Sequence, residues 1–186
     1  MSNWLNLLGY ELVWFVAVYG AGRGLAWPAL VATLLFAAWQ LALSAQRGLE
    51  VRLIVAGAAL GMLVDGALAG TGVLHYAAAS PALPAGGAPL WILALWVAFA
   101  LTLNHSLKWL AARPLLSGLF GALGGPLAYA GAGKLTGAVT FSPPAWHATL
   151  SLAAGWGASL LVLSWLTGYW RRSARDAHAI LERSPT

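Results

Sequence analysis

The chain lacks cysteine and carries few charges. None of its 186 residues is Cys, and only 8% are Asp, Glu, Lys or Arg. The absence of cysteine excludes a disulfide framework and catalysis by a thiol. A soluble domain has about 25% charged residues, so this chain has too few to cover a surface that faces water. Because 60% of the residues are hydrophobic and the mean hydropathy is +0.76, we expect lipid to be its main solvent.

Several functional motifs are also absent. The sequence contains no His-Glu-x-x-His pattern, no Gly-x-Ser-x-Gly elbow and no phosphate-binding loop. We therefore expect no metal and no cofactor. The net charge of +5 does not indicate nucleic acid, because the basic residues lie at the ends of apolar runs and in the C-terminal segment. No basic segment precedes the first apolar run, so we expect no cleaved signal peptide.

Six apolar runs predict an all-α bundle of six transmembrane helices. A membrane-crossing helix needs about 17–25 mostly apolar residues. The predicted spans are 4–22, 25–44, 53–74, 89–110, 115–135 and 146–170. The segment 75–88 is rich in Pro, Gly and Ala, which is typical of a flexible turn region. We expect one transmembrane domain over 1–170 and a basic cytoplasmic tail over 171–186.

The basic residues predict the orientation of the bundle. With both termini in the cytoplasm, eight of the ten Lys and Arg residues lie inside, and only Arg23 and Lys134 lie outside. This bias follows the positive-inside rule. We therefore expect a multi-pass membrane protein with both termini in the cytoplasm. Small residues spaced four apart, such as Gly57 and Gly61 or Gly121 and Gly125, predict close contacts between helices of the same chain or, alternatively, a homodimer face.

Two groups of polar residues lie at membrane depth, where ionisable side chains are rare and often functional. The first has Glu11 at a depth similar to that of Asn104 and His105, which share a predicted helical face with Lys108. Gln40 is a further member. Glu11 paired with His105 or Lys108 is either a structural link between the first and fourth spans, or a proton-handling or substrate-binding site. A third alternative is an unpaired, protonated Glu11, with Lys108 extended toward the membrane surface.

The second group surrounds Asp65, which lies near the middle of the third span. Gly124, Gly125 and Pro126 lie at the same depth in the fifth span, where proline removes a backbone donor and is expected to kink or break the helix. A half-helix that starts at Pro126 would direct its positive end at Asp65 or at an anionic ligand. Tyr129, one turn further on, is a candidate hydrogen-bond donor to Asp65 or to a ligand. A packing kink with a structural Asp65 is the alternative.

Four segments carry a resemblance that spans nearly the whole chain. They are Leu-Asn-Leu-Leu-Gly-Tyr-Glu-Leu-Val-Trp-Phe (5–15), Leu-Val-Asp-Gly-Ala-Leu (63–68), Asn-His-Ser-Leu-Lys-Trp-Leu (104–110) and Gly-Ala-Leu-Gly-Gly-Pro-Leu-Ala-Tyr-Ala-Gly-Ala-Gly-Lys-Leu (121–135). Their order and spacing resemble a bacterial family of small six-helix inner-membrane proteins described only as a domain of unknown function. The resemblance implies lipid modification or envelope stress as a setting, with lipid-modifying enzymes as partners. It also implies glutamine as a frequent residue at position 11, from which Glu11 departs.

Three functions remain open. The first is a non-enzymatic module that binds a lipid or small amphiphile through Asp65, Asn104, His105, Glu11, Gly125, Pro126 and Tyr129. The second is a transporter component similar to the substrate-capturing subunits of energy-coupling transporters, which the broken helix would suit. The third is an intramembrane enzyme that uses Glu11, Asp65 or His105 as acid–base groups. Under all three hypotheses we expect membrane lipids as partners.

Overall fold

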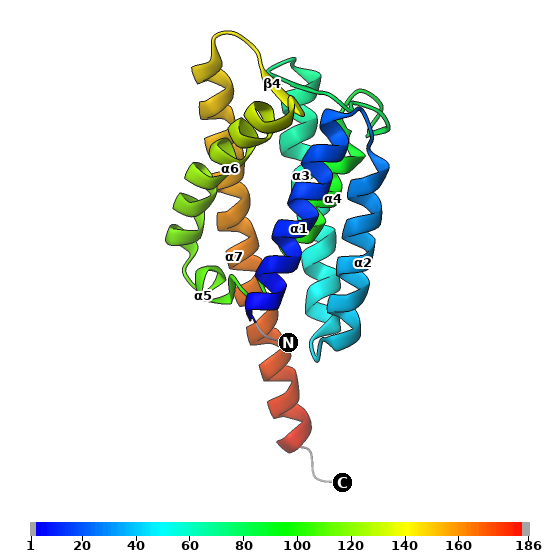
Figure 1. Ribbon diagram of the computed structural model, residues 1–186. Helices are drawn as coiled ribbons and strands as arrows, with labels where there is room; N and C mark the ends of the chain where they lie inside the picture. The colour runs from blue at the N-terminus through cyan, green and yellow to red at the C-terminus, as the bar shows by residue number, and fades with distance from the viewer. Residues whose placement is uncertain (1–2, 184–186) are drawn as a thin grey trace.

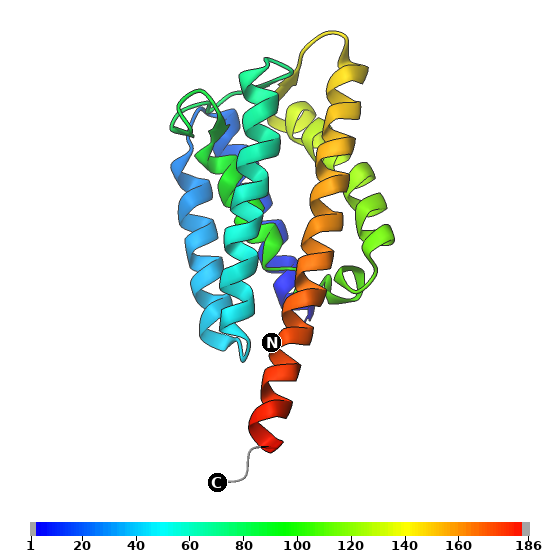
Figure 2. The same ribbon diagram turned by 180° about the vertical axis from the view of Figure 1, so that it is seen from behind.

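The computed structural model describes residues 3–183, with side chains described to residue 173. Within this range the chain folds into seven helices and four short strands. The helices are α1 (Asn3–Gly22), α2 (Trp27–Leu43), α3 (Arg47–Gly70), α4 (Leu90–Ala100), α5 (Lys108–Ala111), α6 (Pro114–Thr136) and α7 (Ala145–Arg183). The longer helices run along a common axis, and α5 lies at one end of the bundle (Figure 1). Seen from behind, α3 and α7 are neighbours (Figure 2).

The exterior of this bundle is apolar. Four helices, α1, α3, α6 and α7, are long and apolar enough to cross a membrane, whereas α2 and α4 are apolar but shorter. Leucines such as Leu115 and Leu127 project outward and are 80% and 72% exposed. Water-soluble monomers rarely expose large continuous apolar patches. These features are those of a membrane protein.

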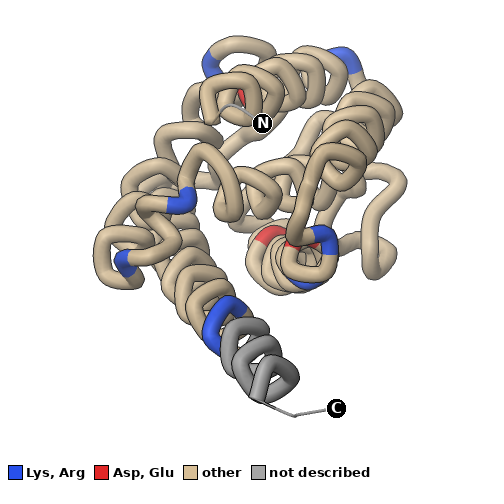
Figure 3. The backbone as a smooth tube through the Cα atoms, turned by 90° about the horizontal axis from the view of Figure 1, so that it is seen from below, with Lys and Arg blue, Asp and Glu red and all other residues tan. Residues whose placement is uncertain are grey.

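Both ends of the described chain lie at the same end of the bundle (Figure 1). Arg47 opens α3 at this end, and Lys108 in α5 and Arg113 before α6 lie there too. The view along the axis shows how sparse the charges are elsewhere (Figure 3). α7 continues as one helix to Arg183, so it extends past the predicted span 146–170. Residues 184–186 of the predicted tail lie outside the described residues.

The predicted helix over 89–110 is wrong in its second half, because α4 ends early and turns over 101–107 lead into α5. In these turns Thr102 Oγ1 donates to the carbonyl of Phe99 at 2.6 Å. Thr, Ser and Asn side chains offer the backbone such alternatives to helical hydrogen bonds. The helical face predicted for three residues of this segment therefore does not form: Asn104, His105 and Lys108.

The segment 75–88, predicted to be a flexible turn region, contains strand residues instead. β1 (Leu74–Tyr76) pairs antiparallel with β4 (Val139–Phe141), and β2 (Ala82–Leu83) pairs antiparallel with β3 (Ala88–Pro89). In the first pair His75 lies opposite Thr140 and remains exposed, so that Tyr76, the next residue, points into the protein and is buried. The strand pair thus covers the end of the bundle opposite the termini and supplies one buried phenol.

α6 is a single α-helix with Pro126 inside it. The predicted alternative of a broken helix is therefore wrong, although the axis of α6 bends along its length (Figure 1). Bending accommodates the backbone hydrogen bond that proline cannot donate. The half of α6 before Pro126 packs closely on α7, because a Cβ at Gly121 would lie 2.5 Å from the Trp156 carbonyl oxygen. Without a break, the helix N-terminus predicted at Pro126 does not form.

Candidate functional site

Asp65 lies in the interior of the bundle and has no exposed surface. Its Oδ1 accepts hydrogen bonds from the hydroxyls of Tyr76 at 2.7 Å and Tyr129 at 2.6 Å. Its Oδ2 accepts one from the indole Nε1 of Trp96 at 2.6 Å. Among the described residues, no ion pair includes Asp65. Hydrogen bonds to the charged form stabilise it, so three donors take the place of the helix terminus expected from the sequence.

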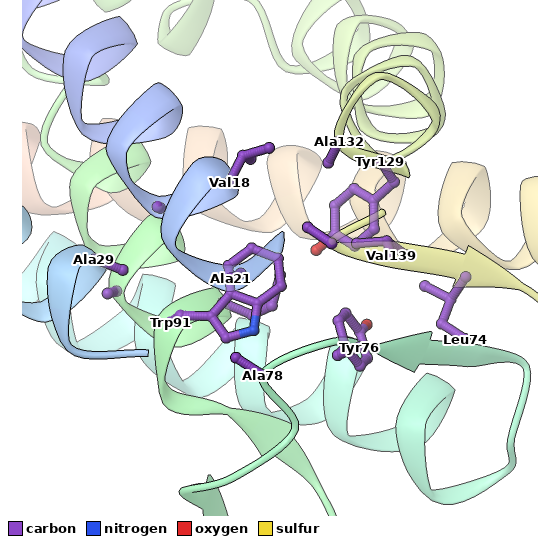
Figure 4. Packing of buried hydrophobic residues seen from close by; sticks show 14 of the residues in the cluster. Val18, Ala21, Ala29, Leu74, Tyr76, Ala78, Trp91, Tyr129, Ala132 and Val139 are labelled. Carbon is purple, nitrogen blue, oxygen red and sulfur yellow. The ribbon is translucent and has the colours of Figure 1, made fainter. Parts of the chain in front are cut away.

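Each donor to Asp65 comes from a different element. Tyr76 is placed by β1, Trp96 by α4 and Tyr129 by α6. The Trp96 ring can lie against α3 because residue 61 is glycine, where a Cβ would collide with the ring. Figure 4 shows the rings of Tyr76 and Tyr129 within the apolar cluster, one from β1 and the other from α6. The carboxyl group of Asp65 therefore connects α3 to three other parts of the fold.

The hydroxyl of Tyr76 is a permanent donor in this cluster. Burial, together with the neighbouring Asp65 carboxylate, raises the pKa of Tyr76 well above its usual value of 10.0. The phenol therefore stays protonated at neutral pH and continues to donate to Asp65.

Aromatic rings extend from this cluster toward the side of the bundle. The Trp96 ring stacks on Trp156 of α7, with centroids 4.0 Å apart and planes 20° apart. Phe99 meets Trp156 edge to face at 5.4 Å, and Tyr10 of α1 meets Phe99 in the same way at 5.7 Å. Such edge-to-face and stacked pairs are favourable arrangements of aromatic rings. A continuous aromatic layer thus connects the Asp65 cluster with α1.

A cavity of about 270 Å³ lies against this layer, between α1, α4, α6 and α7. Its lining is mainly aromatic and glycine, with rings from Tyr10, Trp14, Phe99, Phe120 and Trp156. Gly121, Gly124 and Gly125 of α6 line the facing wall. Gly121 and Gly125 pack directly against Trp156, whereas the space beside Gly124 is left open. We call this space the lateral cavity. Glu11 also lines it and is the one charged group among its described lining residues.

Glu11 and Phe120 place the mouth of the lateral cavity at the side of the bundle. Both residues are exposed, and they belong to α1 and α6, the two helices that border the opening. The predicted ion pairs of Glu11 with His105 or Lys108 are absent among the described residues, in which the one ion pair is between His105 and Glu50. The carboxyl group of Glu11 is therefore at the edge of an apolar space and outside the polar clusters.

His105 pairs with Glu50, a residue that the sequence placed before the third span. Its Nε2 lies 2.7 Å from Oε1 of Glu50, which is fully buried in the first turn of α3. Asn104 Nδ2 donates to the same oxygen at 3.3 Å, and Arg171 Nη2 of α7 donates to Asn104 Oδ1 at 2.8 Å. Because the turns over 101–107 replace a helix, both polar side chains face α3 instead of α1.

Two further polar side chains lie near that end of the bundle. Asn6 Oδ1 accepts hydrogen bonds from the Ser106 backbone at 3.2 Å and from its hydroxyl at 2.5 Å, so α1 is attached to the turns after α4. Gln40 is buried, but it makes no hydrogen bond to any described residue and does not join His105 as predicted.

The seven predicted site residues thus divide among separate places. Asp65 and Tyr129 are in direct contact, which agrees with the prediction of Tyr129 as a hydrogen-bond donor to Asp65. Asn104 and His105 belong to the Glu50 cluster, and Glu11 and Gly125 line the lateral cavity. Pro126 follows Gly125 on α6, inside the continuous helix.

Sequence reasoning missed Glu50, Tyr76 and Trp96. Glu50 could have been found from the apolar residues on both sides of it, Leu49 and Val51, which extend the third apolar run toward Arg47. A carboxyl at the middle of a membrane requires donors, and a buried indole N–H usually requires an acceptor. Trp96, inside the fourth apolar run, was therefore a candidate partner for Asp65. No local pattern indicated Tyr76, because its position depends on the pairing of β1 with β4.

The sequence was compared with protein families, curated proteins and solved structures. Residues 3–162 match the family described as "Protein of unknown function (DUF2878)". No curated protein and no solved structure matches the chain. Because the match covers nearly all of the described helical bundle, this protein belongs to that uncharacterised family.

Proposed function

We propose that this protein binds an amphiphile of the surrounding membrane in the lateral cavity and is not an enzyme. The observation that carries the proposal is an apolar, aromatic space of about 270 Å³ with one carboxyl group at its exposed edge. Ligand pockets are mostly apolar, contain a few polar groups and measure about 300–1,000 Å³, so this one suits a small ligand or part of a larger one. A hydrocarbon chain would fill the cavity, and its polar end would meet Glu11.

The rigidity of the cavity wall supports binding. Trp156 is held by stacking on Trp96, and Trp96 is held in turn by its hydrogen bond to Asp65. A wall that is already ordered loses little conformational freedom when a ligand arrives, which favours affinity. On this proposal Asp65 acts as a support for the site and does not touch the ligand.

The two alternative functions lack such an observation. An acid–base enzyme would find proton donors at Asp65, whose Oδ1 lies 2.7 Å from the Tyr76 hydroxyl and 2.6 Å from the Tyr129 hydroxyl. However, none of these three residues lines the lateral cavity. The broken helix that would have suited a transporter component does not form, because α6 is continuous through Pro126. Lipid-modifying enzymes as partners of this protein remain a prediction from the family resemblance.

We further propose that α2, together with α4 and the turns that follow it, completes six membrane crossings, with both termini in the cytoplasm of a bacterial cell. The basic residues at the end of the bundle that carries both termini support this orientation in the inner membrane. A reporter enzyme fused after residue 186 tests it: cytoplasmic activity is expected, and periplasmic activity would rule the orientation out.

Filling the lateral cavity tests the binding proposal. A Cβ at Gly124 would meet one atom within 4 Å, Phe120 Cε1 at 3.9 Å, so the variant Gly124→Leu places its side chain in the cavity without a backbone collision. Gly48→Leu is the matched control, since Gly48 is also helical, has open space around its Cβ position and lies outside the cavity.

The readout is native mass spectrometry of the three proteins extracted with their own lipids. We expect a bound amphiphile on the wild type and on Gly48→Leu, and its loss from Gly124→Leu at an unchanged melting temperature. Equal occupancy of all three proteins, or none on the wild type, would refute binding in the lateral cavity.

A further inference from the structure

We infer that the ligand of the lateral cavity is a single-chain alkylammonium amphiphile, an organic cation with one hydrocarbon chain and no phosphate. This inference rests on the proposed function and adds the chemical class of the head group. The cavity is lined by five aromatic rings and one carboxyl group, with no basic side chain among the described lining residues.

The aromatic rings and the carboxyl group favour the same kind of charge. The face of an aromatic ring attracts a cation, most strongly where water is excluded, and aromatic cages are a recurring means of binding organic ammonium groups. Trp14 and Tyr10 flank Glu11 on α1, and Phe120 faces them from α6. An ammonium group at the mouth would thus meet aromatic rings and the Glu11 carboxylate together.

The exposed position of Glu11 also requires a partner of this kind. A carboxylate at membrane depth is costly unless a positive group or a set of donors compensates it. Asp65 obtains three donors from the protein. For Glu11, the structure contains no hydrogen bond or ion pair between its carboxyl group and the described residues. A ligand cation would supply this compensation.

The absence of basic groups from the described lining excludes a phosphate next to the cation. A zwitterionic phospholipid would bring a phosphate into the cavity mouth, where neither Lys nor Arg is available to pair with it. Burying an unpaired anion in apolar surroundings is strongly unfavourable. The modest volume of about 270 Å³ also suits one hydrocarbon chain better than two.

The test uses the full-length protein in detergent micelles and four probes that share a twelve-carbon chain: dodecylammonium, 1-dodecanol, dodecanoate and lauroyl lysophosphatidylethanolamine. Dissociation constants are measured by native mass spectrometry. We expect dodecylammonium to bind about tenfold more tightly than dodecanol, as a desolvated cation–π and charge contact allows. In Glu11→Gln this preference disappears while dodecanol binding is unchanged, and in Glu11→Asp, which keeps the charge, the preference remains.

Trp14→Leu provides a second variant that leaves Glu11 in place. Because the ring also lines the apolar space, both probes are expected to bind it more weakly, and dodecylammonium is expected to lose about threefold more affinity than dodecanol. Equal affinity for all four probes would overturn the ammonium assignment and leave the proposed function standing, provided that Gly124→Leu abolishes binding. Tightest binding of the lysophospholipid would overturn the exclusion of phosphate. Failure of every probe to bind the wild type would overturn both proposals.

Discussion

Replacing Trp96 by Phe removes the indole N–H that donates to Asp65 and keeps an aromatic ring in place. Trp96 is 1% exposed, and its Nε1 lies 2.6 Å from Oδ2 of a carboxyl group that has no exposed surface. Oδ2 receives no other hydrogen bond from the described side chains, since both tyrosines donate to Oδ1. The variant therefore leaves one buried carboxylate oxygen without a partner.

The expected loss can be separated from the loss of ring volume. Trp91 is on the same helix and is also 1% exposed, but its Nε1 has no hydrogen-bond partner among the described residues. Trp91→Phe therefore removes the same atoms without breaking a hydrogen bond. Hydrogen bonds to charged groups contribute about 1.5–3 kcal/mol, so Trp96→Phe should lower the free energy of unfolding by about that much more than Trp91→Phe does.

The assay is reversible unfolding in mixed micelles of a denaturing and a mild detergent, followed by circular dichroism. Helical signal is preferable to fluorescence here, because both variants remove a tryptophan from a chain that has 11. Equal losses for the two variants would refute the reasoning, since they would show that the Trp96–Asp65 hydrogen bond adds nothing to the packing of the ring. A larger loss for Trp91→Phe would refute it as well.

Two further predictions concern other parts of the fold. Gly121→Ala should destabilise the protein by about 1–3 kcal/mol, because its Cβ would meet the α7 backbone at 2.5 Å. Gly124→Ala has free space around its Cβ and should have little effect or stabilise α6. Equal melting temperatures for the two variants would contradict the packing described for α6 and α7. His105→Ala should lower the free energy of unfolding by about 3 kcal/mol, because it leaves the Glu50 carboxylate buried without its main partner. Adding Glu50→Gln to the same chain should recover part of that loss. A double-mutant cycle in the same unfolding assay measures the coupling, and strictly additive losses would contradict a direct interaction.

Local features of the sequence carried much of the correct prediction. The scarcity of charge and the apolar runs predicted a helical membrane protein, and the helices α1, α2 and α6 lie within two residues of their predicted bounds. Asp65 was predicted to lie inside the bundle, because a charged group at the middle of an apolar run is costly. Tyr129 was a candidate donor to Asp65 or to a ligand, and the structure shows the contact with Asp65. These inferences needed only composition, run length and helical rise.

The incorrect predictions depended on contacts between distant segments. A Gly-Gly-Pro sequence is compatible with either a break or a bend, and packing of α6 on α7 selects the bend. Equal depth in the membrane made Glu11 and His105 plausible partners, but depth says nothing about direction around the bundle axis. The early end of α4 rotates Asn104 and His105 toward α3, where Glu50 is available.

The sequence alone determined the solvent of this protein, because so few charged residues cannot cover a surface in water, and it determined that a lone acid near the middle of an apolar run must be inside the bundle. Tertiary structure decided which side chains meet that acid and which acid stays at the edge of a cavity. The physical reason is that burial cost follows from residue type and position along one helix, whereas hydrogen-bond partners follow from how helices and strands distant in sequence are turned toward one another.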